Sequence, residues 1–254
     1  MPVRVGRKLV VAGCAIMAAS QVAAAADVSP VFKSPPPADV PASWAGFYVG
    51  GQLGYGMDGV GWRNLGASTS FSPLDSRTRD RGNGLIGGGQ VGYNFQYNHF
   101  VLGIEGSMSG AGLNRSFSSP YFPATDVWSS NLTWLGTITG RVGYEIGSWL
   151  PYVKGGYAVG NLDTSLQSNG VGVVSQGSAI HNGWTVGGGV EYKVTKQFSL
   201  GLELMRTDLG KNNDINGAQT AIATGAAVPG TSESYGVGLR SNSITARINY
   251  LFGR

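Results

Sequence analysis

The sequence predicts an all-β protein, an eight-stranded antiparallel up-and-down transmembrane β-barrel. The clearest observation is the stretch 244–252, where apolar side chains alternate with Thr, Arg, Asn and Leu. A period of two is typical of a β-strand, because successive side chains point to opposite faces of a sheet. Charged residues make up only 13% of the chain and glycine occurs 42 times, which disfavours helices and a well-solvated surface.

The first 43 residues precede the part that is expected to fold. Arg4, Arg7 and Lys8 come before an apolar run and four alanines at 23–26. This order predicts a secretory signal peptide over residues 1–26. Residues 27–43 contain five prolines and predict an extended periplasmic linker, followed by a barrel over 44–254.

Loss of the signal peptide changes what the composition implies. The single cysteine, Cys14, lies inside the signal peptide, so neither a disulfide nor a cysteine metal site is expected in the mature chain. The full chain has 18 basic and 14 acidic residues; without Arg4, Arg7 and Lys8 the balance is 15 against 14. The sequence therefore predicts no nucleic-acid partner.

Eight segments alternate from residue 44 onward, and the first four cover 44–57, 84–97, 100–110 and 132–146. Each has one apolar face, which is the reason for reading it as a strand. These faces consist of Phe47, Val49, Leu53, Tyr55 and Met57; Leu85, Val91, Tyr93, Phe95 and Tyr97; Phe100, Leu102, Ile104 and Met108; and Leu132, Trp134, Ile138, Val142, Tyr144 and Ile146.

The other four segments cover 151–161, 184–194, 198–206 and 244–252. Their apolar faces consist of Val153, Tyr157 and Val159; Trp184, Val186, Val190, Tyr192 and Val194; Phe198, Leu200, Leu202 and Leu204; and Ile244, Ala246, Ile248, Tyr250 and Phe252. The terminal segment is expected to close the barrel against the segment that begins at Trp44.

The connections alternate in length. Short turns are predicted at 98–99, 147–149 and 195–197, and long polar loops at 58–83, 111–131, 162–183 and 207–239. An even number of strands, with short turns at one end and long loops at the other, is typical of bacterial outer-membrane barrels. The sequence therefore predicts a location in the bacterial outer membrane, with the short turns in the periplasm.

A soluble calyx of eight strands would point its apolar face inward instead. The charges on the polar face favour the membrane barrel, because four carboxylates and four cations can pair inside a narrow lumen, as buried charges require. The predicted lumenal charge network consists of Glu105, Arg141, Glu145, Lys154, Glu191, Lys193, Glu203 and Arg247.

Aromatic residues gather at the predicted strand ends, as they do at membrane interfaces. One belt lies near the short turns and the other near the long loops. The first belt consists of Trp44, Phe47, Tyr97, Phe100, Tyr144, Trp149, Tyr192, Phe198, Tyr250 and Phe252, and the second of Tyr55, Trp134 and Trp184.

Motifs of enzyme chemistry are nearly absent. The glycine-rich stretch 87–92 fits a dinucleotide-binding spacing, but it lies within a predicted strand with no helix after it. Its glycines are better explained by crowding inside a small barrel. Neither His99 nor His181 has a neighbouring serine and carboxylate in sequence. We expect no enzyme activity, no catalytic or metal site and no cofactor.

Four arginines are candidates for contact with the membrane surface. Arg77, Arg79 and Arg81 fall in the first predicted long loop, and Arg206 lies at the outer end of the seventh segment. One interpretation is an ordinary solvated loop. The other is binding of anionic lipopolysaccharide, whose phosphates arginine can contact with two hydrogen bonds.

Four motifs together resemble a known family. They are WAGFYVGG at 44–51, GRVGY at 140–144, PYVKGG at 151–156 and ARINYLF at 246–252. In this order they are similar to the small porin-like outer-membrane proteins of alphaproteobacteria, within the OmpA-like β-barrel superfamily. The resemblance implies insertion by the outer-membrane assembly machinery, which reads a terminal strand with an aromatic end, here Phe252.

These observations favour a structural surface barrel that supports envelope integrity and has at most narrow porin-like permeability. Its expected partners are outer-membrane lipid and lipopolysaccharide. The alternative is a protein that binds a ligand or host molecule through its long loops. Some relatives of this type bind haem, and His181 is the one histidine expected at a loop edge.

Overall fold

The computed structural model describes residues 43–66, 71–231 and 233–252. The predicted signal peptide (1–26) and all of the predicted linker except Ser43 lie outside this part. Over the described residues the chain forms nine strands: β1 (Gly46–Asn64), β2 (Arg77–Tyr97), β3 (Phe100–Ser118), β4 (Asp126–Tyr144), β5 (Trp149–Ser168), β6 (Val173–Lys193), β7 (Phe198–Gly217), the two-residue β8 (Thr220–Ala221) and β9 (Glu233–Leu251).

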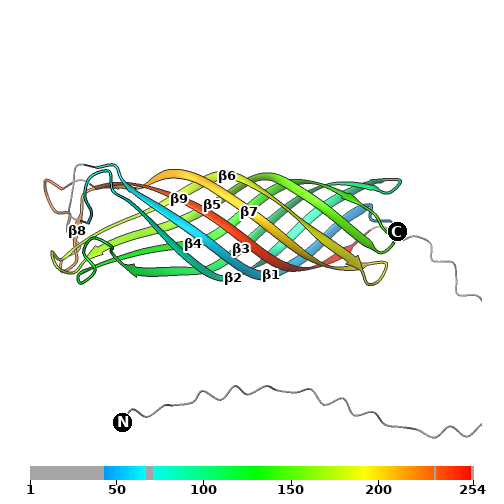
Figure 1. Cartoon of the computed structure of the whole chain (residues 1–254), viewed down its shortest axis with the longest axis horizontal. Coiled ribbons are helices and arrows are strands. Elements are labelled where there is room, and N and C mark those ends of the chain that lie inside the picture. Colours follow the sequence, from blue (N-terminus) through cyan, green and yellow to red (C-terminus); the bar gives the residue numbers. More distant parts are fainter. Residues whose placement is uncertain (1–42, 67–70, 232, 253–254) are drawn as a thin grey trace, which may run out of the picture. The chain divides into compact units, whose positions relative to one another are not determined.

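The eight long strands form one closed antiparallel sheet (Figure 1). Neighbours in the chain pair with one another from β1 to β7, and β7 pairs with β9. The ring closes between β9 and β1, where Tyr48 lies opposite Leu251. The predicted all-β barrel, and its closure by the terminal strand, are therefore confirmed.

Three short connections lie at one end of the barrel, which we call the short-turn end. Asn98 adopts a positive φ of 53° in the two-residue turn before β3, and Gly147 adopts 61° between β4 and β5. Asparagine and glycine tolerate this left-handed conformation better than other residues do. The third connection covers residues 194–197, so all three predicted short turns are present.

The predicted long loops are wrong in extent. The strands continue well past the predicted ends, and the connections at the opposite, long-loop end shrink to 65–76, 119–125, 169–172 and 218–232. The strands are longer because apolar and polar residues continue to alternate beyond the predicted segments. In these extensions the apolar residues point inward and the polar residues outward. In β1, for example, the pattern continues from Met57 to Asn64.

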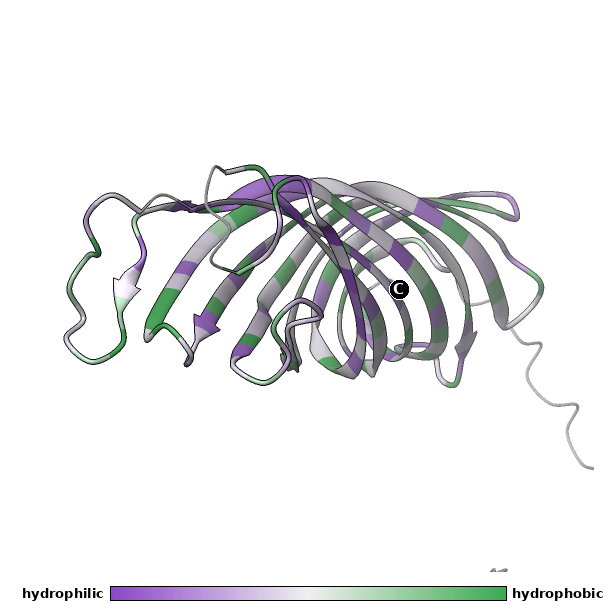
Figure 2. Cartoon of the chain, turned by 60° about the vertical axis from the view of Figure 1, so that its left-hand side comes forward, coloured by the Kyte–Doolittle hydropathy of each residue, from purple (hydrophilic) through white to green (hydrophobic). Residues whose placement is uncertain are grey.

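Near the short turns, the strands carry apolar side chains outside and polar ones inside. We call this part the membrane segment; it comprises residues 46–57, 85–97, 100–110, 134–144, 149–159, 184–193, 198–206 and 244–251. Phe47, Leu53 and Met57 point outward, with 63%, 64% and 56% of their surface exposed. Hydrophobic and hydrophilic residues alternate along the strands in Figure 2. Only a lipid surround can cover so large an apolar exterior.

Both aromatic belts lie on the exterior with one exception. Trp44 was predicted to face lipid near the short turns, but it is fully buried and packs inside the barrel against Tyr48, Val101 and Leu150. The residue lies just before β1, so it is free of the strand's alternation. Its backbone N–H is held by Gln96 Oε1 at 2.6 Å.

Toward the long loops, the same strands carry apolar side chains inside. We call this part the distal segment; it comprises residues 58–64, 77–84, 111–118, 126–133, 160–168, 173–183, 207–217 and 233–243. Its buried apolar residues form a hydrophobic cluster together with Phe71 of the 65–76 connection and Ala158 of β5. We call this cluster the upper core; it consists of Val60, Trp62, Phe71, Trp128, Leu132, Ala158, Leu162, Leu166, Val173, Leu209, Ile215, Tyr235, Val237 and Leu239.

A bulge in β4 marks the boundary between the two segments. Leu132 lies opposite Leu162 and Trp134 opposite Asn161, so Thr133 is an extra residue in β4. An extra residue shifts the alternation of side chains along a strand. Leu132 therefore enters the upper core, while Trp134 two positions later faces outward in the membrane segment.

Candidate functional site

The interior of the membrane segment holds the predicted lumenal charges. All eight of these side chains are buried. Six of them, three carboxylates and three cations, form a connected network, which we call the charge layer: Glu105, Arg141, Lys154, Glu191, Glu203 and Arg247. Its formal charges cancel.

Lys154 and Arg247 each bridge two carboxylates. Lys154 Nζ lies 2.8 Å from Glu105 Oε1 and 2.8 Å from Glu203 Oε2. Arg247 donates through Nη2 to Glu105 and through Nη1 to Glu203. Glu105 comes from β3, Lys154 from β5, Glu203 from β7 and Arg247 from β9, so the layer joins opposite sides of the barrel.

Arg141 extends the charge layer to a third carboxylate and to two tyrosines. Its Nη1 lies 2.8 Å from Glu191 Oε1, and its guanidinium lies 4.7 Å and 5.2 Å from the ring centres of Tyr48 and Tyr152. The hydroxyls of both tyrosines donate to carboxylates at 2.7 Å, Tyr48 to Glu105 and Tyr152 to Glu203. Burial strengthens such contacts because water cannot compete for them.

Glycines make room for the two tyrosines. A Cβ at Gly92 would lie 2.3 Å from the Tyr48 hydroxyl, and one at Gly189 would lie 2.8 Å from the Tyr152 hydroxyl. Gly92 belongs to the glycine-rich stretch 87–92, which lies within β2. The interpretation of this stretch as relief of crowding inside the barrel agrees with these distances.

The other two predicted lumenal charges lie at the short-turn end, outside the charge layer. Lys193 Nζ donates to the Ser43 carbonyl at 2.8 Å and lies 4.2 Å from the Trp44 ring centre. Glu145 accepts a hydrogen bond from Gln96. Together with the apolar cluster of Trp44, Tyr48, Val101, Leu150 and Leu251, they cover the charge layer on this side.

The upper core covers the charge layer on the other side. Trp128 is its centre: the ring centres of Trp62, Phe117 and Tyr235 lie 5.5, 5.9 and 6.1 Å from that of Trp128. The Tyr235 hydroxyl lies 2.9 Å from Ser72 Oγ, and burial raises the pKa of this phenol. Sequence reasoning missed this core, although the alternation of Val60 with Trp62, and of Tyr235 with Val237 and Leu239, signals it.

His181 does not lie at a loop edge. It belongs to β6, points inward with 1% of its surface exposed, and its Nε2 lies 2.8 Å from Asp214 Oδ1. Burial raises the pKa of the Asp214 carboxyl, and the hydrogen bond from His181 partly opposes this rise. A side chain enclosed in this way does not suit a surface haem site. His99 lies in a short turn, with its ring stacked 5.8 Å from that of Tyr144.

The candidate arginines lie on strands and not in a loop. Arg77, Arg79 and Arg81 alternate on the outward face of β2 in the distal segment. Arg206 points outward from β7 at the edge of the membrane segment, opposite Asn242. Their contact with lipopolysaccharide stays a prediction.

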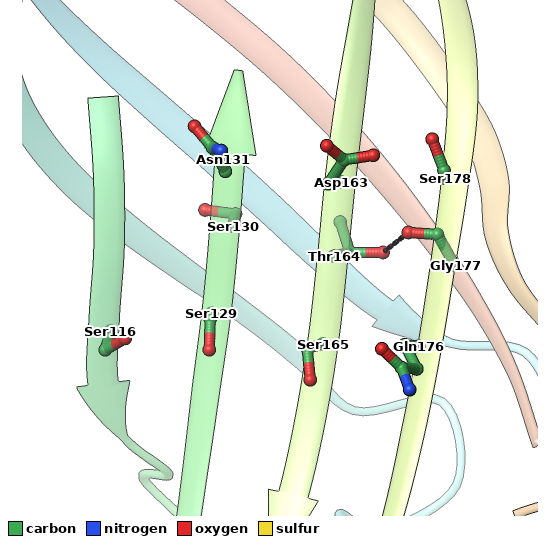
Figure 3. A pocket seen from close by; sticks show the side chains of 10 residues that line it. All are labelled: Ser116, Ser129, Ser130, Asn131, Asp163, Thr164, Ser165, Gln176, Gly177 and Ser178. Atoms are coloured by element: carbon green, nitrogen blue, oxygen red, sulfur yellow. Dashed lines mark hydrogen bonds between the residues drawn. The ribbon is translucent and has the colours of Figure 1, made fainter. Parts of the chain in front are cut away.

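The opposite side of the distal segment is polar with little charge. A concavity of about 810 Å³ lies across β3 to β6. Figure 3 shows the ten residues that line it. These residues are Ser116, Ser129, Ser130, Asn131, Asp163, Thr164, Ser165, Gln176, Gly177 and Ser178. Hydrogen bonds from Ser178 and Thr133 lower the pKa of the Asp163 carboxyl.

Among the described residues, no helix is long and apolar enough to cross a membrane. Nor do three or more His, Cys, Asp or Glu side chains gather there in a way that could hold a metal ion.

Comparisons with known proteins agree with this architecture. The family model described as "Outer membrane protein beta-barrel domain" matches residues 11–248. The 31 kDa outer-membrane immunogenic protein of Brucella melitensis is 30% identical over 222 residues, which cover 82% of this chain and 89% of that protein. The 22 kDa outer membrane protein of Rhizobium leguminosarum bv. viciae is 32% identical over 168 residues, 65% of this chain and 64% of that protein.

Solved structures are much less similar in sequence. The outer membrane protein OprG from Pseudomonas aeruginosa is 10% identical, with a TM-score of 0.46, and the match covers 83% of this chain and 97% of that one.

Proposed function

Because the chain belongs to the outer membrane protein β-barrel domain family, we propose that it is a closed structural barrel of the bacterial outer membrane. In this proposal the barrel supports the envelope and passes at most small, brief currents. The short-turn end faces the periplasm, and the distal segment stands outside the bilayer.

The filled interior is the observation that carries this proposal. A permeating ion would have to pass the cluster around Trp44, the charge layer and the upper core in turn. An eight-stranded barrel is just wide enough for its own side chains to fill it. An ion in either apolar layer would lose its hydration without gaining a partner, which is strongly unfavourable.

In this proposal the chain is not an enzyme. Both histidines have positions that other contacts explain, His181 beside Asp214 and His99 against Tyr144. Among the described residues, neither histidine is hydrogen bonded to a serine or threonine hydroxyl. A nucleophile activated by a neighbouring base has no candidate in this arrangement.

Planar-bilayer recording of the refolded barrel tests this function. We expect brief, small openings for the wild type, and more frequent ones for Trp44→Ala, which removes the largest side chain of the inward cluster at the short-turn end. Trp149→Ala is the matched control, because Trp149 lies at the same end but faces outward. Steady conductance of the wild type, in samples whose heat-modifiable gel mobility shows a closed barrel, would contradict the proposal.

The envelope role has its own test. A strain that lacks this protein should be more sensitive to bile salts and large antibiotics. The wild-type gene should restore resistance without raising the uptake of small solutes. Restored resistance that depends on solute uptake would argue for a pore.

A further inference from the structure

A groove of about 460 Å³ crosses the outer surface of the distal segment over β2, β1, β9 and β7. Two sets of outward side chains border it. Arg63, Arg77, Arg79 and Arg81 lie on the side of β1 and β2, and Asp208, Lys211 and Arg240 on the side of β7 and β9. Arg206 lies nearer the apolar exterior and does not line the groove.

Glycines form the floor of this groove. Gly61 lies between Arg79 on β2 and Gly238 on β9, and Gly59 lies between Arg81 and Arg240. A Cβ at Gly61 would meet no atom within 4 Å. No side chain therefore covers the backbone of Gly59 and Gly61 between the two rows of cations, which leaves room for a ligand to lie between these rows.

Most of the cations along the groove form no salt bridge among the described residues. Arg63 pairs with Asp75 and Arg240 with Asp208, each at 2.7 Å. Arg77, Arg79, Arg81 and Lys211 form no salt bridge within 4.0 Å among the described residues. All four are exposed. Unpaired cations held close together repel one another, so an anion between them would relieve this repulsion.

The groove lies at the level where lipid headgroups are expected. Met57 on β1 and Leu85 on β2 are the last large apolar side chains on the outward faces of these strands. On β1, Gly59 is the next outward residue after Met57, roughly 7 Å farther along the strand. On β2, Arg81 is the second outward residue beyond Leu85, roughly 13 Å farther along. The groove faces sideways toward this layer and not upward toward the solvent.

We propose that this groove binds the phosphate groups of a glycolipid of the outer leaflet, with Arg79, Arg81 and Lys211 as its principal ligands. Arginine offers a planar pair of N–H donors that fits two phosphate oxygens, and lysine adds a point charge. The lipid's sugar backbone would lie over Gly59 and Gly61, while its acyl chains would follow the apolar exterior below. This proposal needs the membrane location but does not depend on whether the barrel conducts.

Binding of lipid A to the refolded barrel, without its predicted signal peptide, tests the proposal. The barrel is held in zwitterionic detergent and titrated with bisphosphorylated lipid A, with dephosphorylated lipid A, and with inorganic pyrophosphate. We expect lipid A to bind at least tenfold more tightly than its dephosphorylated form, because hydrogen bonds to charged groups supply roughly tenfold each. Pyrophosphate should compete only weakly, and added salt should weaken binding.

Two variants separate the groove from general charge. Arg79→Gln/Arg81→Gln should weaken lipid A binding by about tenfold or more. Gly61→Leu should weaken it by filling the floor, with no change in charge. The matched controls are Lys196→Gln, an exposed lysine at the short-turn end, and Gly106→Leu, an outward glycine of the membrane segment whose added Cβ also meets no atom within 4 Å.

The outcomes are distinct. Weaker binding by the two groove variants, with both controls at wild-type affinity, supports the proposal. Equal affinity of the groove variants and the wild type overturns it, provided that heat-modifiable mobility shows all of them folded. Pyrophosphate binding as tight as lipid A binding would overturn the lipid assignment, because the site would then take soluble anions.

Discussion

The membrane segment and the distal segment are built from the same strands with opposite chemistry. In β1, Phe47, Leu53 and Met57 point outward, while Tyr48 and Gln52 point inward. A few residues later, Val60 and Trp62 point inward and Arg63 points outward. The alternation of the strand does not change; only the side that is apolar does.

This contrast shows that the surroundings decide which face of a strand is apolar. Where lipid surrounds the barrel, apolar side chains can face outward, and charges must pair inside. Where water surrounds it, the interior becomes an ordinary hydrophobic core. The change occurs near Met57 on β1 and at the Thr133 bulge on β4, and these positions mark one edge of the apolar exterior.

The largest expected effect comes from breaking the polar interior of the membrane segment. Glu105→Ala leaves Lys154 and Arg247 with one carboxylate fewer in a buried site. Removal of one partner from a buried ion pair typically costs about 3–5 kcal/mol. Urea unfolding of the refolded barrel in lipid vesicles measures the loss, and Ile104→Ala, an outward neighbour, is the control. A similar loss in both variants would argue against the charge layer as a stabilising element.

Removal of the centre of the upper core should cost nearly as much. Trp128→Ala opens a cavity beside Trp62, Phe117 and Tyr235, and such truncations typically cost about 3–5 kcal/mol. Part of this loss should fall on the distal segment alone, since the membrane segment keeps its own contacts. Hydrogen exchange resolved by segment measures this division, with Val127→Ala, its outward neighbour, as control. Uniform loss of protection along all strands would show that the two segments unfold as one.

A charged side chain on the outward face should lower the free energy of unfolding strongly only in the membrane segment. Leu202 faces outward near the middle of the membrane-segment part of β7 (198–206), and Leu202→Lys should cost about 2–4 kcal/mol. Ser165→Lys occupies an outward position of the distal segment and should change stability by about 0.5 kcal/mol or less. Unfolding in lipid vesicles compares the two. Equal losses would mean that both positions have the same surroundings.

The smallest expected effect is a pH dependence from the distal interior. Burial raises the pKa of Asp214 in the folded chain. The folded state therefore holds the proton more tightly than the unfolded state. This favours folding below the unfolded pKa and is lost as the pH rises through the folded pKa. The pH profile of stability should be flatter for Asp214→Asn over that range, which unfolding at a series of pH values measures. An unchanged profile would assign the dependence to other groups.

Sequence reasoning predicted the membrane segment well because it has a strong signal. Residues such as Leu200, Leu202 and Leu204 alternate with polar ones over a full membrane span, and few other folds produce that pattern. The inward position of the eight lumenal charges followed from the same alternation. Their pairing could not be predicted, since Glu105 and Arg247 are 142 residues apart and meet only across the lumen.

The sequence predicts loops where the distal segment forms strands. These strands point polar residues outward and apolar residues inward, as the strands of a soluble protein do. Glycines, serines and asparagines on the outward face, such as Ser129 and Asn131, are common in loops as well. Only the spaced apolar residues between them, such as Trp128 and Leu132, indicate strands. His181 and Arg79 were misplaced for the same reason, since both lie in strands that were expected to be loops.

Spin labels along the outward face of β5 test the reversal between the two segments most directly. The only cysteine of the chain is Cys14, so a barrel refolded from residues 27–254 has no cysteine of its own. Single cysteines at Val153, Tyr157, Asp163 and Ser165 can therefore be labelled in the barrel in lipid vesicles. We expect the first two labels to be more accessible to oxygen and the last two to a water-soluble nickel complex. The same preference at all four positions would contradict a membrane boundary within β5.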